Sequence, residues 1–436
     1  MRGKKTRGIL ILCCLFVLVY LRYLGNQNEE VEVAQNVTES DLTEIEQEEA
    51  NVKEEADMTG ENIRVLIMGN GYKGEVHEAV TISSESEVCI CYGDEQESIE
   101  AEKIFTIEPD DKRFAEGNIV ISSDEKIVLE HLERGYGTPS YEGDIELIAT
   151  AEGIVIINEL SVEKYLKAVV PSEMPASYEL EALKAQAVCA RTYACRQMEE
   201  YGYPEYEAHV NDSTDYQVYG NVEAQKSTNQ AIKETNGQTV YYQGEMATTY
   251  YYSTSCGQTT DMSAWGAKTT GENGYLAPVE VKGDNGDYEK NLPWYQWSVE
   301  VSKDHLSDLV GLNTGKDIGK IKDIEVTKRG SGDVATELKV TGEKGTVVVE
   351  TENKIRAALG GEGYQIVRND GSVIDSQKLL PSAFFTIKKR GDKFLIEGGG
   401  FGHGIGMSQN GANEMAKDGA DYREILELFY QDIEIR

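Results

Sequence analysis

One glutamate in this sequence stands where a single carboxyl group could act as an acid or a base. Glu173 lies between Pro171 and Pro175 in the run Val-Pro-Ser-Glu-Met-Pro. Two prolines stiffen the chain, which lowers the ordering cost of holding one acid in place. The apolar neighbours Val170 and Met174 disfavour the charged form of a carboxyl group, as a general acid requires. A glutamate that merely decorates a turn between two helices fits the same pattern, so spacing alone leaves both interpretations open.

A helix rich in small residues is predicted directly after this turn. Residues 178–198 carry apolar side chains at helical spacing, and Ser177 is a suitable N-cap. Gln186 and Arg191 are polar residues among alanines, which makes them candidates for orienting Glu173 or a ligand. An ordinary polar helix surface explains the same pattern.

A hydroxyl-rich segment provides a third candidate site. In residues 248–259, tyrosines alternate with serines and threonines before a glycine turn. Tyrosine rings can stack on a ligand, and hydroxyl groups can hydrogen-bond to it. Ser253, Thr254, Ser255 and Gly257 are therefore candidate ligand-binding residues. A simple amphipathic strand and loop accounts for the segment equally well.

A glycine-rich segment at residues 398–409 forms the fourth candidate site. Its glycines allow positive φ angles and close approach of the backbone to a ligand or a strand. The segment lacks the Lys-Ser/Thr pair of a P-loop and the final glycine of a dinucleotide-binding fingerprint. His403 is therefore interpreted as a structural or ligand-facing imidazole, with Ser408 and Gln409 as ligand-binding candidates. The chain contains no HExxH and no GxSxG, which argues against zincins and α/β-hydrolases.

The elements that position these residues predict an α+β fold. Helices are expected at 162–170, 178–198, 354–359 and 422–430. Strand-like runs are expected at 63–68, 80–83, 87–92, 119–122, 145–149, 239–242, 247–255, 297–301, 321–328, 337–341, 346–350, 384–388 and 393–398. Strands scattered among helices without regular β-α-β alternation are typical of this class. We therefore expect a mixed, β-rich body with a long central helix and a groove.

The N-terminus predicts a membrane anchor. Arg2, Lys4, Lys5 and Arg7 precede an apolar run at residues 9–21. Basic residues before an apolar run keep the N-terminus in the cytoplasm and export the remainder of the chain. We expect a single-pass signal anchor at 1–25, and therefore a folded part outside the cytoplasm.

The remaining regions follow from composition. Residues 26–61 are dense in Glu and Asp and are predicted to form a disordered acidic stalk. Residues 62–144 are expected to form a β-rich part, and residues 145–436 the domain that carries the four candidate sites. The net charge of −35 argues against nucleic-acid binding, which needs clustered Lys and Arg.

The cysteines do not predict a metal site or a disulfide framework. They are Cys13, Cys14, Cys89, Cys91, Cys189, Cys195 and Cys256. No pair has CxxC spacing, and none is placed with a histidine in a zinc pattern. We therefore expect neither a metal nor a cofactor, and interpret most cysteines as small core residues.

Taken in order, the four segments resemble those of the SpoIID/LytB family. The resemblance covers roughly residues 145–432 and is highly specific as a combination. It rests on Asn158-Glu159-Leu160, Tyr165-Leu166, the turn around Glu173, Lys184-Ala185-Gln186-Ala187-Val188, Arg191-Thr192-Tyr193, Gln217-Val218-Tyr219, Ser253-Thr254-Ser255, Leu380-Pro381-Ser382 and Gly402–Gln409.

The resemblance implies a lytic transglycosylase that cuts peptidoglycan glycan strands already stripped of peptides. Its setting would be engulfment in sporulation, beside a cell-wall amidase and other engulfment membrane proteins. The catalytic glutamate of the family corresponds to Glu173, and Tyr219 joins the candidate substrate-binding residues. Glu173 would protonate the bridging oxygen and then take the proton of the muramoyl C6 hydroxyl, closing a 1,6-anhydro ring. That intramolecular hydroxyl removes the need for a second carboxylate.

Two points keep an alternative open. The amidase-enhancer branch of the family implies a non-catalytic module that binds glycan and stimulates an amidase. Some relatives look to carry a zinc site of His and Cys ahead of the Gln-Val-Tyr segment. Here residues 209–216 keep His209 but contain no cysteine, so the metal prediction remains none.

Overall fold

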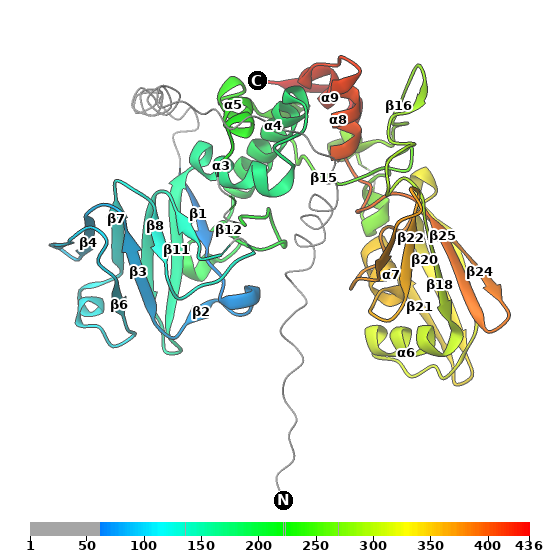
Figure 1. Ribbon diagram of the computed structural model, residues 1–436, viewed down its shortest axis with the longest axis horizontal. Helices are drawn as coiled ribbons and strands as arrows, with labels where there is room; N and C mark the ends of the chain where they lie inside the picture. Colours follow the sequence, from blue (N-terminus) through cyan, green and yellow to red (C-terminus); the bar gives the residue numbers. More distant parts are fainter. Residues whose placement is uncertain (1–61, 136, 221, 223, 269) are drawn as a thin grey trace, which may run out of the picture. The chain divides into compact units, whose positions relative to one another are not determined.

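The computed structural model describes residues 62–135, 137–220, 222, 224–268 and 270–436 (Figure 1). The predicted anchor and acidic stalk lie outside these residues. Among the helices of the described part, none combines the length and the apolar character needed to cross a membrane. The body contains both helices and many strands, which confirms a β-rich α+β fold.

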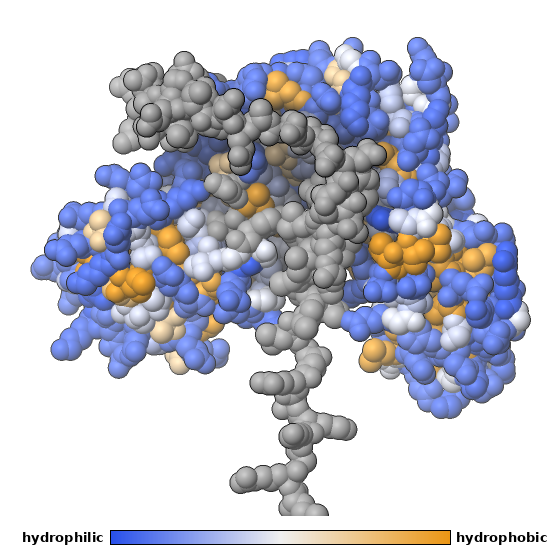
Figure 2. Space-filling model, in the orientation of Figure 1, coloured by the Kyte–Doolittle hydropathy of each residue, from blue (hydrophilic) through white to orange (hydrophobic). Residues whose placement is uncertain are grey.

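The chain divides into two compact units that are not consecutive in sequence. Of the described residues, unit 1 contains those from Asn62 to Glu173 and those of the segment Gln197–Ala224. Unit 2 contains Met174–Arg196 and Gln225–Arg436. In the space-filling view, the visible surfaces of the described parts are mostly hydrophilic (Figure 2), as the net charge of −35 leads one to expect.

Unit 1 is built on two sheets. The larger sheet follows the order β12(Val210–Asn211), β1(Asn62–Leu66), β11(Ile154–Ser161), β10(Asp144–Ala149), β7(Ile119–Ser123), β4(Val88–Tyr92) and β5(Glu95–Ile99), and β2(Val76–His77) also pairs with β11. The smaller sheet follows the order β6(Phe105–Ile107), β3(Val80–Ser84), β8(Ile127–Leu129) and β9(Ser140–Tyr141). All pairings are antiparallel except β1 with β12.

The apolar pattern explains where these strands lie. Strand β3 alternates between buried and half-buried residues, as expected when only one face of a strand is covered. Strand β11 is buried continuously from Ile154 to Asn158 because strands pair on both of its edges and both of its faces are covered. It leads directly into helix α3(Val162–Glu173), which ends at the candidate catalytic residue.

Helix α3 is longer than the sequence predicts. The expected helix ends at Val170, but the structure continues through Pro171 to Glu173. A proline inside a helix removes one backbone donor, so Pro171 cannot donate to the carbonyl four residues earlier, and the helix ends two residues later. The hydroxyl of Ser172 donates to the carbonyl of Ala168 at 2.6 Å and satisfies one of the last acceptors. The expected compact turn between the two prolines is therefore reduced to the residues after Glu173.

Unit 2 contains the remaining sheets. A five-stranded antiparallel sheet has the order β23(Val373–Asp375), β22(Gln365–Arg368), β18(Trp297–Ser302), β25(Lys393–Gly398) and β24(Phe385–Arg390). A three-stranded sheet has the order β19(Ile321–Arg329), β20(Ala335–Gly342) and β21(Thr346–Glu350). A second three-stranded sheet has the order β14(Glu245–Met246), β13(Val240–Tyr242) and β27(Ile433–Ile435). Two smaller pairings are β15(Tyr251–Tyr252) with β26(Met407–Ser408), and β16(Lys282–Gly283) with β17(Gly286–Asp287).

Six α-helices of the described residues begin in unit 2. They are α4(Leu180–Gln197), α5(Lys226–Glu234), α6(Lys303–Thr314), α7(Glu352–Leu359), α8(Gln409–Lys417) and α9(Tyr422–Phe429). Met174, the first residue of this unit, is only 1% exposed and belongs to its apolar core, together with Leu183 and Val188 of α4. Packing in this core therefore fixes the position of Met174, the residue that follows Glu173.

The strand expected at 247–255 shrinks to the two residues of β15. The surrounding hydroxyl groups bond to local backbone and to other side chains, which competes with a regular ladder.

Candidate functional site

In unit 1, the carboxylate of Glu173 is held by the backbone. The amide of Val218 donates to Oε1 of Glu173 at 2.8 Å, and the side chain is half-buried. Glu173 is also the last residue of α3, where the carbonyl groups of the final turn point toward it. Together these features give the carboxyl group a defined position.

The segment that presents the Val218 amide is anchored by its neighbour. Tyr219 is 2% exposed, and its hydroxyl donates to Oδ1 of Asn158 at 2.9 Å. Its ring lies 4.9 Å from that of Tyr165 and 5.5 Å from that of Tyr141. The structure thus places Tyr219 in the core of unit 1, where its side chain supports the segment that contacts Glu173.

A buried ion pair supports the same segment. The guanidinium of Arg134 contacts Asp212 at 2.7 Å, and the two side chains are 1% and 0% exposed. The second oxygen of Asp212 accepts from the amide of Met68 at 2.9 Å. This pair ties the chain that leads to Val218 to the end of strand β1.

In unit 2, Gln186 and Arg191 are fully buried on helix α4. Arg191 donates to the carbonyls of Ile232 at 3.3 Å and Gln238 at 3.2 Å, so it satisfies acceptors at the end of helix α5. Oε1 of Gln186 accepts from Gln409 at 3.2 Å, whereas its Nε2 has no partner among the described residues. The structure therefore joins two of the predicted residues, Gln186 and Gln409.

His403 is held by the backbone on both ring nitrogens. Nε2 lies 2.9 Å from the carbonyl of Tyr251, and Nδ1 accepts from the amide of Ile405 at 3.1 Å. The ring lies against Tyr252 and Trp265, with centroids 5.4 and 5.1 Å away. Burial disfavours the charged imidazolium and lowers the pKa of His403 to about 4. A neutral imidazole with both nitrogens engaged positions the loop and does not supply a proton.

The glycine requirement is clearest at Gly406 and Gly257. Gly406 has a φ of 73°, and a Cβ there would lie 2.1 Å from the carbonyl oxygen of Tyr250. Gly257 has a φ of 96°, and a Cβ there would lie 2.5 Å from Oδ2 of Asp287. Both positions combine a left-handed backbone with a close approach, which only glycine accommodates.

The hydroxyl segment and the glycine-rich segment meet in unit 2. Strand β15 pairs with β26 in parallel, so that Tyr252 is the register partner of Ser408. The amide of Ser255 donates to Oγ of Ser408 at 3.2 Å. Oγ of Ser253 lies 3.1 Å from Oγ1 of Thr254. Two segments that are 150 residues apart in sequence therefore form one local arrangement.

Sequence reasoning missed Glu289, the acid at the centre of this arrangement. Its side chain is fully buried and contacts both Ser255 and Ser408. Burial raises the pKa of Glu289 to about 7, against the lowering effect of these hydrogen bonds. The sequence around it is a polar stretch after a glycine turn, and nothing in that pattern indicates burial.

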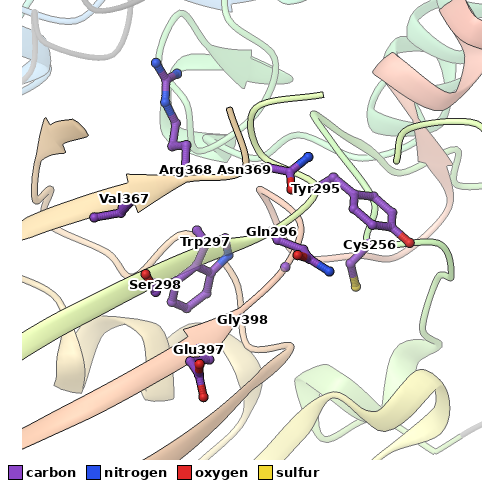
Figure 3. A pocket seen from close by; sticks show the side chains of 11 residues that line it. Cys256, Tyr295, Gln296, Trp297, Ser298, Val367, Arg368, Asn369, Glu397 and Gly398 are labelled. Carbon is purple, nitrogen blue, oxygen red and sulfur yellow. The ribbon is translucent and has the colours of Figure 1, made fainter. Parts of the chain in front are cut away.

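A cavity of about 610 Å³ lies beside the two segments in unit 2 (Figure 3). Strands β18, β22 and β25 line it with the loop residue Cys256 and with Gly398 and Gly399. Tyr295 and Cys256 lie at one end, whereas the guanidinium of Arg368 points away from the other labelled side chains (Figure 3). The lining includes Cys256, which lies between Ser255 and Gly257 in sequence, but it includes none of the predicted binding residues.

Within the described ranges, no group of three or more His, Cys, Asp or Glu side chains is placed to hold a metal ion. His209 uses Nδ1 to accept from the amide of Arg64 at 3.0 Å.

Two protein-family models match different parts of the chain. A family model described as SpoIID, stage II sporulation protein, matches residues 150–242 and so includes Glu173 and Val218. A model described as a domain of unknown function matches residues 279–406 and includes Glu289.

Three curated relatives show the extent of the similarity. An uncharacterized protein of Brachyspira hyodysenteriae is 31% identical over 68% of this chain and 72% of its own length. The amidase enhancer of Bacillus subtilis is 30% identical over 61% of this chain, but over only 39% of its own length. Stage II sporulation protein D of Bacillus subtilis is 30% identical over 64% of this chain and 75% of its own length. Because three quarters of a relative with this identity is matched and the family model spans the helix that carries Glu173, the chain belongs to the SpoIID/LytB family.

Proposed function

We propose that this chain is a lytic transglycosylase that cuts peptide-stripped peptidoglycan strands between N-acetylmuramic acid and N-acetylglucosamine. Membership of the SpoIID/LytB family and the similarity to stage II sporulation protein D support a role in sporulation engulfment. The proposal includes a single-pass membrane anchor at residues 1–25 and a folded part outside the cytoplasm. It also includes a cell-wall amidase and other engulfment membrane proteins as partners.

The observation that carries the proposal is the setting of Glu173. The Val218 amide, at 2.8 Å, favours a carboxylate by hydrogen bonding. The C-terminal end of helix α3 disfavours a negative charge at the same place. A residue that must both give and take a proton needs an environment that accommodates both forms.

The chemistry then requires one carboxyl group. Protonated Glu173 donates its proton to the glycosidic oxygen as the bond to C1 of the muramoyl residue breaks. The C6 hydroxyl of that residue attacks C1, and the Glu173 carboxylate takes the hydroxyl proton. The products are a shortened strand and an end with a 1,6-anhydro ring. No water is consumed, so a second carboxylate to activate water is not needed.

We also propose a glycan-binding role for the two meeting segments of unit 2. The residues of the hydroxyl segment that we assign to this role are Ser253, Thr254, Ser255 and Gly257. In unit 2, the residues proposed to support these segments are Gln186, Arg191, His403, Ser408 and Gln409. In unit 1, Tyr219 is proposed to support the segment that contacts Glu173.

The test uses peptide-free glycan strands and mass spectrometry. The full-length chain is expected to produce fragments one water lighter than hydrolysis would give. Glu173→Gln should lose this activity while its thermal unfolding curve stays unchanged, because the amide keeps the shape of the side chain. Fragments carrying an added water would contradict the transglycosylase mechanism.

A second candidate function follows from the similarity to the amidase enhancer of Bacillus subtilis. In that case the chain binds glycan without cutting it and stimulates an amidase. The two functions separate in one experiment, because wild-type chain that binds strands but never shortens them supports the enhancer. Stimulation of a purified amidase by Glu173→Gln would then equal that by the wild type.

A further inference from the structure

One fully buried carboxyl group of unit 2 has no part in the proposed cleavage. Glu289 is 0% exposed and follows strand β17 in a short connection to β18. It forms no ion pair with any residue in the described part of the chain. An unpaired buried acid is costly, so its retention calls for a compensating role.

The contacts of Glu289 all go to the two meeting segments. Oε1 accepts from the amide of Ser255 at 2.9 Å and from the hydroxyl of Ser408 at 2.8 Å. Oε2 accepts a short hydrogen bond from the hydroxyl of Ser255. Three donors from two segments therefore converge on one carboxylate.

Each of these serines organises its own segment in turn. Oγ of Ser255 accepts from the amide of Gly257 at 3.2 Å. Ser408 is the N-cap of helix α8, and its Oγ accepts from the amide of Gly411 at 3.2 Å. Through Ser255 and Ser408, the carboxylate thus reaches the turn at Gly257 and the start of helix α8.

We propose that Glu289 is the positioning residue of this region, whose carboxylate clasps the 253–257 loop to the N-terminus of helix α8. Glu289 touches no substrate in this account. It acts through Ser255 and Ser408, which hold the arrangement of the 253–257 loop. The link to ligand binding rests on the proposed glycan-binding role of that loop.

The surroundings make this clasp sensitive to protonation. The titratable groups that face Glu289 are Glu414 on helix α8, Cys256 and Tyr252 on the hydroxyl segment, and Tyr295 before β18. None of these groups supplies a positive charge, and Glu414 raises the pKa of Glu289 further. Burial, the largest cause, brings that pKa to about 7.

Both forms of Glu289 can hold the clasp. A protonated carboxyl group carries a donor on one oxygen and keeps acceptor capacity on the other. Oε2 then donates to the hydroxyl of Ser255 while Oε1 still accepts from the Ser255 amide and from Ser408, so protonation removes the buried charge without releasing the loop. Other nearby groups do not titrate in the same range, since the pKa values of His403 and Cys256 lie at about 4 and about 12.

Hydrogen exchange of the full-length chain between pH 5 and 9 tests the clasp without a ligand. After correction for intrinsic rates, protection of the Ser255 and Gly411 amides should fall through a step centred near pH 7, because ionisation of a buried carboxyl group favours open forms of the loop in which water reaches it. A difference of about one to two pKa units between the closed and open forms corresponds to a change of roughly 10- to 100-fold in protection. The wild-type titration needs no variant, and the absence of a step would overturn the proposal.

Two variants sharpen the experiment. Glu289→Gln cannot ionise and should remove the step, leaving the protection of the loop amides independent of the charge at this position. Glu414→Gln is the matched control, because it keeps every contact of Glu289 but removes a nearby negative charge. Its step should remain and move to lower pH. A step that persists in Glu289→Gln would assign it to another group and overturn the proposal.

Binding of peptide-free glycan strands gives the functional arm. In a Glu173→Gln background, affinity should fall above pH 7 with Glu289 present and should show no such step with Glu289→Gln. Equal affinity in both chains at every pH would overturn the link to ligand binding. If neither chain binds strands, the proposed function fails, and the exchange experiment still decides whether Glu289 is a clasp.

Discussion

The buried ion pair between Arg134 and Asp212 allows a sharp prediction about unit 1. Arg134→Met keeps an apolar side chain of similar length but leaves the Asp212 carboxylate, 0% exposed, without its cation. Burial already raises the pKa of Asp212, so loss of the guanidinium exposes the full cost of the buried charge. Breaking such a pair from one side costs about 3–5 kcal/mol. For a unit of this size that corresponds to a fall in Tm of roughly 10 °C.

Differential scanning calorimetry of the full-length chain provides the assay. The double variant Arg134→Met/Asp212→Asn should recover part of the lost stability, because the uncharged amide still accepts from the Met68 amide and no buried charge is left unpaired. Arg113→Met is the control, since its pair with Asp111 is more exposed and is worth about 1 kcal/mol or less. A single variant that costs less than about 1 kcal/mol, or a double variant that shows the sum of both losses, would refute the reasoning.

Three further predictions concern the carboxyl groups and their supports. Burial raises the pKa of Glu289 from 4.5 to about 7, so the stability it contributes is present below pH 4.5 and is lost as the pH rises through 7. In urea unfolding, the free energy of unfolding of the wild type should therefore fall by up to about 3 kcal/mol between pH 5 and pH 8. Glu289→Gln should not show this fall. Tyr219→Phe should lower the free energy of unfolding by about 1–3 kcal/mol, because Oδ1 of Asn158 loses its buried donor. An unchanged Tm in thermal unfolding would show that this hydrogen bond does not stabilise unit 1. Val218→Pro removes the amide that donates to Glu173. At an unchanged fold, it should lower the rate of strand cleavage, measured by mass spectrometry of the products, by about tenfold or more. Full activity would show that this bond does not position the acid.

Local patterns predicted most elements but not how they combine. Strands such as β3 and β4 follow from alternation of apolar residues, and helix α4 follows from its helical spacing. Helix α3 continues through Pro171 to Glu173, and local pattern did not predict this because a proline normally ends or kinks a helix. The non-consecutive make-up of the two units has no local signature, since it depends on contacts distant in sequence.

The candidate site shows the same limit. The sequence indicated Glu173 through its rigid setting, and the family resemblance was confirmed by the comparisons. It did not predict the Val218 amide, because that contact joins positions 45 residues apart. Glu289 could not be found either, because a glutamate after a glycine turn is usually exposed. Only packing of the 253–257 loop and helix α8 around it makes the residue buried.

The burial of polar residues also changes how the motifs are interpreted. The sequence suggested that Arg191 and His403 could contact a ligand, yet in the structure both side chains hydrogen-bond to backbone carbonyl groups. Motif residues can therefore shape a site by fixing backbone, and a sequence pattern does not separate that role from direct contact.

The central claim is that the Glu173 carboxyl group transfers the proton that cuts the strand. The most direct measurement is the mass of products formed from peptide-free glycan by the wild type and by Glu173→Gln at equal thermal stability. The account predicts 1,6-anhydro ends from the wild type and none from the variant. Anhydro products from Glu173→Gln at the wild-type rate would contradict it.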